Sequence, residues 1–504
     1  MDASRRACFA LTALLLAAGP LTAGDDAQTL ADRIDRRLAD RWAEANVKPA
    51  DLADDAEFQR RITLDLIGRI PRVVEARSFQ GETAPGRRRA LIDRLLDSPG
   101  YAGCFARFWA ERWLPQGDAQ FDNLKPEFLD WLRTRLRENA PYDRMAREVL
   151  GTGGRTSRLF LQANEFKPEN LAGAVSRDFL GVSLECAQCH DHPAGLWKRE
   201  QFWQFAAFFA GGPEDKRSAA LEITDPVTKR KTTPRFLDGA PPAREDVAGR
   251  RLLAEWMTDR RNPYFARAAV NAVWAHFFGA SLVDSLDDLR DGAWSETMPH
   301  RGNAELLGDL GAAFADHDYD LKYLIRGVAL TRAYQLTSAG PADALDPRLF
   351  ARAAVRPLSG DQLFDSLLLA TGLNEDALAA PAEYGKPVTP PRQAFLAFFA
   401  RGEGAASRRT IPQALLMMNG RLTGEAVDLQ EGRTLRAVAE APFLTTADKV
   451  EALYLAALGR PPRPAERDRL VAYVESGRPR KDPDSALADV FWALLNSSEF
   501  GVNH

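Results

Sequence analysis

Glu57-Phe-Gln-Arg-Arg-Ile-Thr-Leu-Asp-Leu-Ile67 places apolar residues three or four positions apart, which is the period of one face of an α-helix. The same period recurs through the first half of the chain, where Pro99, Pro126 and Pro141 stand at breaks or first turns. The other segments with this pattern are Ala31 to Ala45, Arg87 to Leu96, Glu127 to Leu136 and Met145 to Leu150. The pattern predicts a mainly α protein built from amphipathic helices.

The helical period is interrupted over 216–242, where threonines alternate with charged and apolar residues. This stretch predicts a short hairpin or an extended linker. Helical signals then resume, most clearly at Val247 to Met257 and Tyr264 to Phe278. About 480 residues are also too many for a single hydrophobic core. We therefore expect two helical domains, 24–215 and 243–504, joined by a short extended or hairpin segment.

Residues 1–23 have the parts of a secretory signal peptide. Arg5 and Arg6 form a positive start, an apolar stretch follows from Ala7 to Ala18, and small residues then permit cleavage after Ala23. The apolar stretch is shorter than the roughly 20 residues that span a bilayer. We therefore expect removal of this peptide, no transmembrane segment in the mature chain, and an exported protein that is periplasmic, cell-surface or extracellular.

Composition narrows the class of protein further. The content of 45% hydrophobic and 27% charged residues is that of a soluble globular protein, and the formal net charge of −4 gives no electrostatic basis for binding nucleic acid. Cys8 lies within the predicted signal peptide, so only Cys104, Cys186 and Cys189 remain afterwards. Three cysteines are too few for a disulfide framework.

Cys186-Ala-Gln-Cys189-His190 is the Cys-x-x-Cys-His pattern that attaches a c-type haem. Two thiols three positions apart can each form a thioether with one vinyl group of the porphyrin, and His190 then lies under the iron as proximal ligand. His192 is too close in sequence to reach the opposite face of the ring, so it would donate a hydrogen bond or bind a second metal. The pattern predicts haem c on Cys186, Cys189 and His190, and makes His190 and His192 candidate metal ligands.

Other chemistries use the same residues. A structural zinc site would combine Cys186 and Cys189 with His190 or His192. A dithiol oxidoreductase would use the same two thiols, but no helix N-terminus or βαβ context follows them, and a local disulfide would only stiffen the loop. A metal hydrolase would use His190, Asp191 and His192. Expected export favours haem, because bacteria attach it covalently outside the cytoplasm.

Aromatic residues cluster after this motif, and they predict either the wall of a haem pocket or a helix buried on most of its faces. His276, in an apolar helix, is expected to be a core histidine rather than a distal ligand, and Cys104 a small buried hydrophobe. The aromatic residues concerned are Trp197, Phe202, Trp203, Phe205, Phe208 and Phe209.

Segments in both halves of the chain resemble known protein families. Those in the first half resemble domain-of-unknown-function family 1549, a planctomycete cytochrome-like domain, and they are Phe58 to Gly68, Leu95 to Tyr101 and Leu180 to Pro193. Those in the second half are similar to family 1553, the usual companion of the first, and they are Asn262 to Gly279 and Leu458 to Pro462. The resemblance implies a large secreted bacterial protein, and it implies no particular reaction.

The leading hypothesis is an exported protein that carries one c-type haem for electron transfer or haem-dependent redox chemistry, with a redox partner protein. The first alternative is a non-catalytic surface or scaffold protein with zinc or a disulfide at the cysteine motif. The second alternative is a metal-dependent hydrolase.

Overall fold

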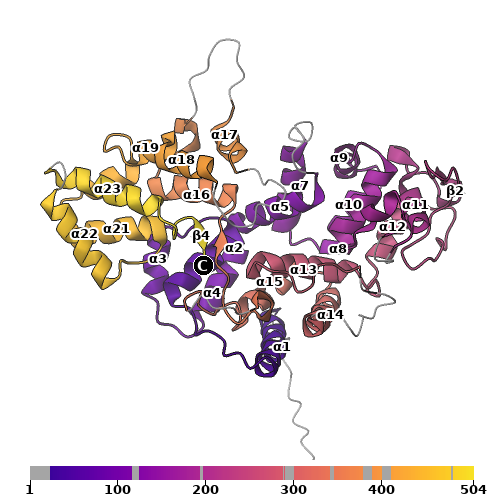
Figure 1. Ribbon diagram of the computed structural model, residues 1–504, viewed down its shortest axis with the longest axis horizontal. Helices are drawn as coiled ribbons and strands as arrows, with labels where there is room; N and C mark the ends of the chain where they lie inside the picture. The colour runs from indigo at the N-terminus through magenta and orange to yellow at the C-terminus, as the bar shows by residue number, and fades with distance from the viewer. Residues whose placement is uncertain are drawn as a thin grey trace, which may run out of the picture.

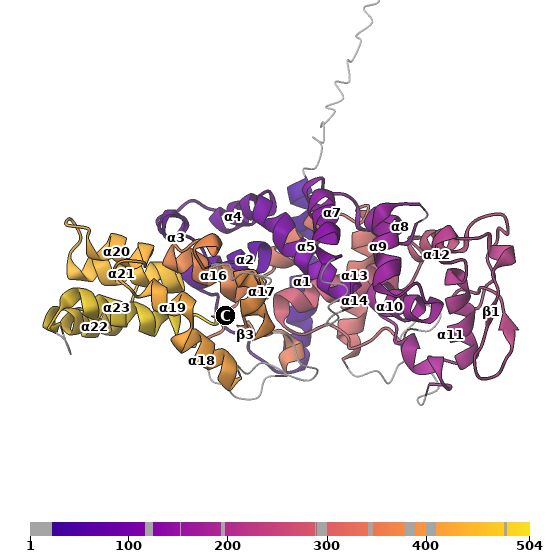
Figure 2. The same ribbon diagram turned by 90° about the horizontal axis from the view of Figure 1, so that it is seen from above.

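A computed structural model describes residues 23–115, 124–151, 153–192, 197–287, 289, 300–340, 346–378, 389–399, 410–477 and 481–504. Helices dominate these residues, and each strand among them is two residues long. The predicted mainly α fold is therefore confirmed. Two hydrophobic cores lie along an elongated molecule, with the smaller core at the left of Figure 1, and the view in Figure 2 keeps this arrangement.

The larger core is formed by helices that come from both predicted halves of the chain. Those from the first half are α1 (Ala23–Glu44), α2 (Asp55–Ile67), α3 (Val73–Gln80), α4 (Arg87–Leu96), α5 (Pro99–Trp113), α7 (Lys125–Arg137), α8 (Tyr142–Leu150), α9 (Arg155–Ala163), α10 (Pro168–Leu180) and α11 (Arg199–Ala206), with the 3₁₀ helices η1 (Leu184–Gln188) and η2 (Ala207–Phe209). Those from the second half are α12 (Gly249–Met257), α13 (Phe265–Phe278), α14 (Arg301–Asp316) and α15 (Leu321–Leu330).

The smaller core is formed by the later helices. They are α16 (Gly360–Thr371), α17 (Pro391–Ala397), α18 (Ile411–Asn419), α19 (Arg421–Ala426), α20 (Arg433–Ala439), α21 (Thr446–Leu458), α22 (Pro464–Ser476) and α23 (Pro483–Leu495). The strands form two antiparallel pairs, β1 (Ile223–Thr224) with β2 (Lys231–Thr232) and β3 (Arg356–Pro357) with β4 (Val502–Asn503).

Local signals set the ends of the helices next to the cysteine motif and at the joint between the cores. The side chain of Asp54 accepts a hydrogen bond from the backbone N–H of Glu57 and starts α2, and Gly68 ends it with φ of 74°. Pro168 opens α10, and Gly181 ends it with φ of 66°. A Cβ atom at Gly181 would also lie 2.9 Å from Cδ1 of Leu286, so this position requires glycine for two reasons.

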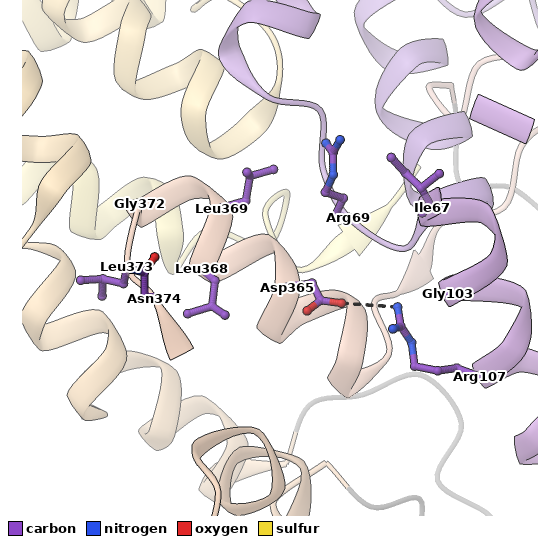
Figure 3. Close-up of a pocket in the computed structure, with 11 residues that line it drawn as sticks. Ile67, Arg69, Gly103, Arg107, Asp365, Leu368, Leu369, Gly372, Leu373 and Asn374 are labelled. Carbon is purple, nitrogen blue, oxygen red and sulfur yellow. Dashed lines mark hydrogen bonds and ion pairs between the residues drawn. The ribbon is translucent and has the colours of Figure 1, made fainter. Parts of the chain in front are cut away.

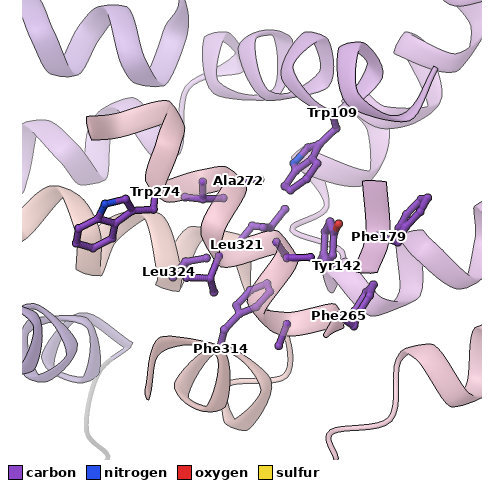
Figure 4. Packing of buried hydrophobic residues seen from close by; sticks show 14 of the residues in the cluster. Trp109, Tyr142, Phe179, Phe265, Ala272, Trp274, Phe314, Leu321 and Leu324 are labelled. Atoms are coloured by element: carbon purple, nitrogen blue, oxygen red, sulfur yellow. The ribbon is translucent and has the colours of Figure 1, made fainter. Parts of the chain in front are cut away.

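The larger core joins helices on either side of the predicted 216–242 boundary. Tyr142 of α8 packs between Trp109 of α5 and Phe265 of α13, with ring centroids 4.8 and 5.0 Å away (Figure 4). The hairpin of β1 and β2 forms within 216–242. Hydrophobic packing passes from one core to the other farther along the chain, between Ala351 and Leu358. The domain limits 24–215 and 243–504 thus remain a prediction from the sequence. The two hydrophobic cores do not separate at these limits but between Ala351 and Leu358.

Helix α2 lies at the joint between the cores (Figure 1). Its Phe58 belongs to the larger core and its Leu64 to the smaller one. Arg60 is 1% exposed and donates to backbone carbonyls of the smaller core, including that of Phe500 at 2.9 Å. Arg61 is 2% exposed and donates to carbonyls of the larger core, including that of Leu336 at 2.8 Å. Two adjacent arginines therefore tie α2 to both cores.

Among the described residues, no helix has both the length and the apolar character needed to cross a bilayer. Residues 1–22, which contain nearly all of the predicted signal peptide, lie outside the described residues.

Candidate functional site

The cysteine motif lies on η1 and the residues just after it, between α10 and α11. A 3₁₀ helix has three residues per turn, so positions three apart share a face. Leu184 and Ala187 point inward and are fully buried, whereas Cys186 and Cys189 are exposed and are free thiols. The Cys-x-x-Cys spacing therefore leaves both cysteines exposed, Cys186 on η1 and Cys189 at its C-terminal cap.

His190 follows on the same exposed segment, and its ring orientation is set by a backbone contact. Its Nδ1 lies 2.8 Å from the carbonyl oxygen of Asp191. A carbonyl oxygen can only accept, so Nδ1 carries a proton, and in the neutral imidazole the lone pair therefore lies on Nε2. Histidines that bind metals commonly hold the other ring nitrogen in this way. The Nε2 atom of His190 is thus prepared to act as a ligand.

Asp287 contacts residues on both sides of the cysteine motif, Ser183 before it and Trp197 after it. One of its carboxylate oxygens, Oδ1, accepts from the backbone N–H of Ser183 at 2.8 Å and from Nε1 of Trp197 at 2.9 Å. Its other oxygen accepts from the hydroxyl of Ser285, and the Asp287 residue is 7% exposed. The backbone N–H of Leu286 donates to the carbonyl of Gly181 at 2.9 Å, just before the loop. A segment about 100 residues away in sequence therefore positions the motif.

Arg199 holds the other side of the loop. Its guanidinium donates to the carbonyl oxygen of Cys189 and to both carboxylate oxygens of Asp225, at 2.6 and 2.9 Å. Its backbone N–H donates to Oδ1 of Asp191 at 2.9 Å. Burial raises the pKa of Asp225, but hydrogen bonds from the backbone of Val227 and from Arg199 outweigh it and lower this pKa to about 2.

A buried carboxyl group lies behind the motif on α10. Burial raises the pKa of Asp178 to about 6, although Arg177 beside it favours the charged form. The guanidinium of Arg177 also pairs with Glu185 of η1. Arg177 thus links α10 to the helix that carries Cys186.

The aromatic residues after the motif pack inside the larger core, and each is at most 6% exposed. Phe208, for example, stacks on Phe236 with ring centroids 4.9 Å apart. Of the two interpretations offered by the sequence, the buried helix describes them. Trp197 differs from the others because its indole nitrogen also donates to Asp287.

His192 is the second candidate metal ligand beside the motif. The backbone N–H of His192 donates to the carbonyl of Trp197 at 2.8 Å, which helps to close the loop. Within the described ranges, no three His, Cys, Asp or Glu residues form a group that could hold a metal ion. Binding of a structural zinc ion, or of a metal ion for hydrolysis, at His190 and His192 therefore remains a prediction, because the described residues do not bring a set of metal ligands together.

His276 and Cys104 lie together in the core, away from the motif. Nε2 of His276 donates to the carbonyl of Asp65 at 2.8 Å, and its ring packs edge-on against Phe108. Burial lowers the pKa of His276. Cys104 is 7% exposed, and burial raises the pKa of its thiol to about 12, so it is not a nucleophile at neutral pH. Both core interpretations are confirmed.

Sequence reasoning identified the motif but missed Asp287, Arg199 and Asp225. Asp287 lies in a loop without periodic pattern, and nothing in a single sequence indicates that it reaches Ser183 and Trp197. The sequence signals for the other two residues are weak. Arg199 stands just before the aromatic residues of the next helix, and Asp225 begins a turn before Pro226.

Comparisons with protein families support the resemblance. Residues 33–214 match the model of a family described as a protein of unknown function, DUF1549 (PSCyt2). Residues 249–409 match a second family with the same description, DUF1553 (PSD1). No curated protein and no solved structure matched the chain. The two families occur in the order that the sequence predicts.

Proposed function

We propose that this chain, whose two parts match the family models DUF1549 and DUF1553, is an exported redox protein. In this proposal one c-type haem is attached to Cys186 and Cys189, His190 is an axial ligand, and the protein exchanges electrons with a partner protein. The bound haem would supply a one-electron redox centre.

The observation that carries this proposal is the contact between His190 and Asp191. The proton held on Nδ1 by the carbonyl 2.8 Å away leaves Nε2 as the free ligand atom. Cys186, Cys189 and His190 are all exposed on one segment, so porphyrin and attachment machinery can reach them from solvent. The residue types, their order and their accessibility fit a covalent haem.

The surrounding residues would give this group a fixed position. Asp287 holds Ser183 and Trp197, and Arg199 holds the carbonyl of Cys189. These contacts restrict the loop at both ends, which lowers the entropy that is lost when it is ordered around a ligand. Export is part of the same proposal, since covalent attachment in bacteria takes place outside the cytoplasm.

The test is haem staining of the denatured and reduced protein, made in a host that matures c-type cytochromes. We expect peroxidase-type staining at the mass of the chain, because a thioether survives denaturation. Cys186→Ser with Cys189→Ser should abolish the stain, and the matched control Cys104→Ala should retain it. His190→Ala should keep covalent haem but shift the Soret band.

The alternatives give different results in the same preparation. About one zinc per chain without haem, in a host with working maturation, would overturn the proposal in favour of a structural metal site. Protein without haem or metal whose Cys186 and Cys189 are oxidised to each other would favour the scaffold.

A further inference from the structure

An open pocket of about 510 Å³ lies at the joint between the two cores (Figure 3). Its helices α2 and α16 lie well away from α10 and α11, which flank the cysteine motif (Figure 1). One wall comes from the end of α2 and from α5, and the other from α16 and the residues after it. The lining residues are Ile67, Arg69, Gly100, Gly103, Arg107, Asp365, Leu368, Leu369, Gly372, Leu373 and Asn374. Its volume and its place between two cores are those of a small-molecule site.

Two glycines on α5 shape the pocket in different ways. A Cβ atom at Gly100 would lie 2.8 Å from Cβ of Ile67, so this glycine lets α5 approach α2 closely. One turn later, a Cβ atom at Gly103 would meet nothing within 4 Å. Glycine is less favourable than alanine inside a helix. Gly103 therefore keeps a helix face open at a cost in stability that packing does not require.

Arg107 is the charged group that is least engaged by its neighbours at this pocket. Its Nη2 lies 3.4 Å from Oδ2 of Asp365, whereas charge-assisted hydrogen bonds are typically about 2.7 to 2.9 Å long. Arg69 is more fully occupied, since it donates to both carboxylate oxygens of Glu75 at 2.8 Å. The Oδ1 atom of Asp365 accepts from Arg392. Both oxygens of Asp365 thus face arginines, which disfavours a cationic ligand.

Apolar side chains cover the opposite wall. Leu368 and Leu369 lie on α16 across from Arg107 in Figure 3, and Leu373 follows them at the end of the helix. A ligand that fills this space would therefore contact a cation at one end and aliphatic carbon along its length.

We propose that this pocket binds a small organic acid with an aliphatic body. Its carboxylate is held by the guanidinium of Arg107, with the positive charge of Arg69 nearby, and its carbon chain lies against Ile67, Leu368 and Leu369. The arginine fork matches a carboxylate in geometry, and burial of the chain adds a hydrophobic contribution. This site is separate from the cysteine motif and does not depend on haem.

The test uses three probes with the same eight-carbon chain, namely octanoate, octanol and octylammonium, titrated calorimetrically into the full chain. We expect octanoate to bind at one site and at least about tenfold more tightly than the other two, since a hydrogen bond to a charged group contributes about 1.5 to 3 kcal/mol. Arg107→Gln should remove this preference for octanoate. Equal affinity for the three probes would overturn the proposal.

A second variant tests the position of the binding site without changing a charged residue. Gly103→Leu should fill the pocket and abolish octanoate binding, while its far-UV circular dichroism and melting temperature are kept, because a Cβ atom at this position has nothing within 4 Å and the rest of the side chain can extend into the open pocket. Gly424→Leu is the matched control, since Gly424 is exposed on α19 and also has nothing within 4 Å. Octanoate binding that persists in folded Gly103→Leu would place the site elsewhere and refute the assignment.

Discussion

The hydroxyl of Tyr334 donates to the carboxylate of Asp65 across 2.8 Å, and both groups are buried. The same carboxylate accepts from Arg356 at 2.9 Å and from Nδ2 of Asn503 at 2.8 Å. Asp65 therefore joins α2 to the segment after α15 and to strands β3 and β4. A buried carboxylate with this many donors is stable only while they all remain.

Replacement of this carboxylate should unfold the joint between the cores. Asp65→Asn leaves the guanidinium of Arg356 without its counter-charge, so we expect a loss of about 3 to 5 kcal/mol in the free energy of unfolding, measured in urea. Asp97→Asn is the control, because the side chain of Asp97 is 73% exposed in its pair with Lys322 and should change stability by less than about 1 kcal/mol. Similar losses in both variants would argue against a special role for Asp65.

Loss of Asp287 should loosen the cysteine loop before the rest of the fold. Asp287→Ala removes the acceptor of the Ser183 N–H and of the Trp197 indole, so we expect faster hydrogen exchange at Ser183 and a red shift of tryptophan emission. The nearby Asp284→Ala should change neither, since the side chain of Asp284 is 75% exposed. Unchanged exchange at Ser183 in the Asp287 variant would show that this contact does not hold the loop.

The ion pair between Arg199 and Asp225 should make stability depend on acid pH. The pKa of Asp225 is about 2 in the folded chain against an ordinary 3.8, so the folded state binds fewer protons than the unfolded state between these values. Its contribution is present above pH 3.8 and is lost as the pH falls towards 2. Asp225→Asn should therefore be less stable than the parent chain at pH 6 and approach it near pH 2. A stability difference independent of pH would contradict this linkage.

His276 should remain neutral where ordinary histidines titrate. Burial lowers the pKa of His276, so protonation is favoured in the unfolded state and its contribution to stability falls as the pH drops below 6.5. Nitrogen-15 NMR of the ring at pH 6.5 should show His276 less protonated than an ordinary histidine, with the proton of its neutral form on Nε2, as the bond to the carbonyl of Asp65 requires. A ring that is at least as protonated as an ordinary histidine at that pH would refute this description.

The first residues provide a prediction that depends on sequence alone. Exported protein should begin within a few residues of Gly24, because the apolar stretch before it is too short to remain as a membrane span. Intact mass analysis of material from outside the cytoplasm provides the measurement. Exported chains that retain Met1 would be incompatible with a cleaved signal peptide.

Local patterns in the sequence were sufficient for the helical class, for the end of α2 at Ile67, and for the cysteine motif. Each of these depends on residues close together in the chain: apolar residues three or four positions apart, and thiols three positions apart. The core positions of His276 and Cys104 were also predicted, because a polar group on an otherwise apolar helix face must be buried with that face.

Only the tertiary structure decided which distant segments meet. Tyr142 packs between Trp109 and Phe265, so the larger core crosses the boundary that the interrupted helical period suggested. Asp287 likewise reaches back about 100 residues to hold the motif. The pocket at Gly103 and Arg107 likewise needs α16 as its second wall. Periodicity shows which face of a helix is apolar, but it does not show which helix covers it, since any apolar face satisfies the same hydrophobic requirement.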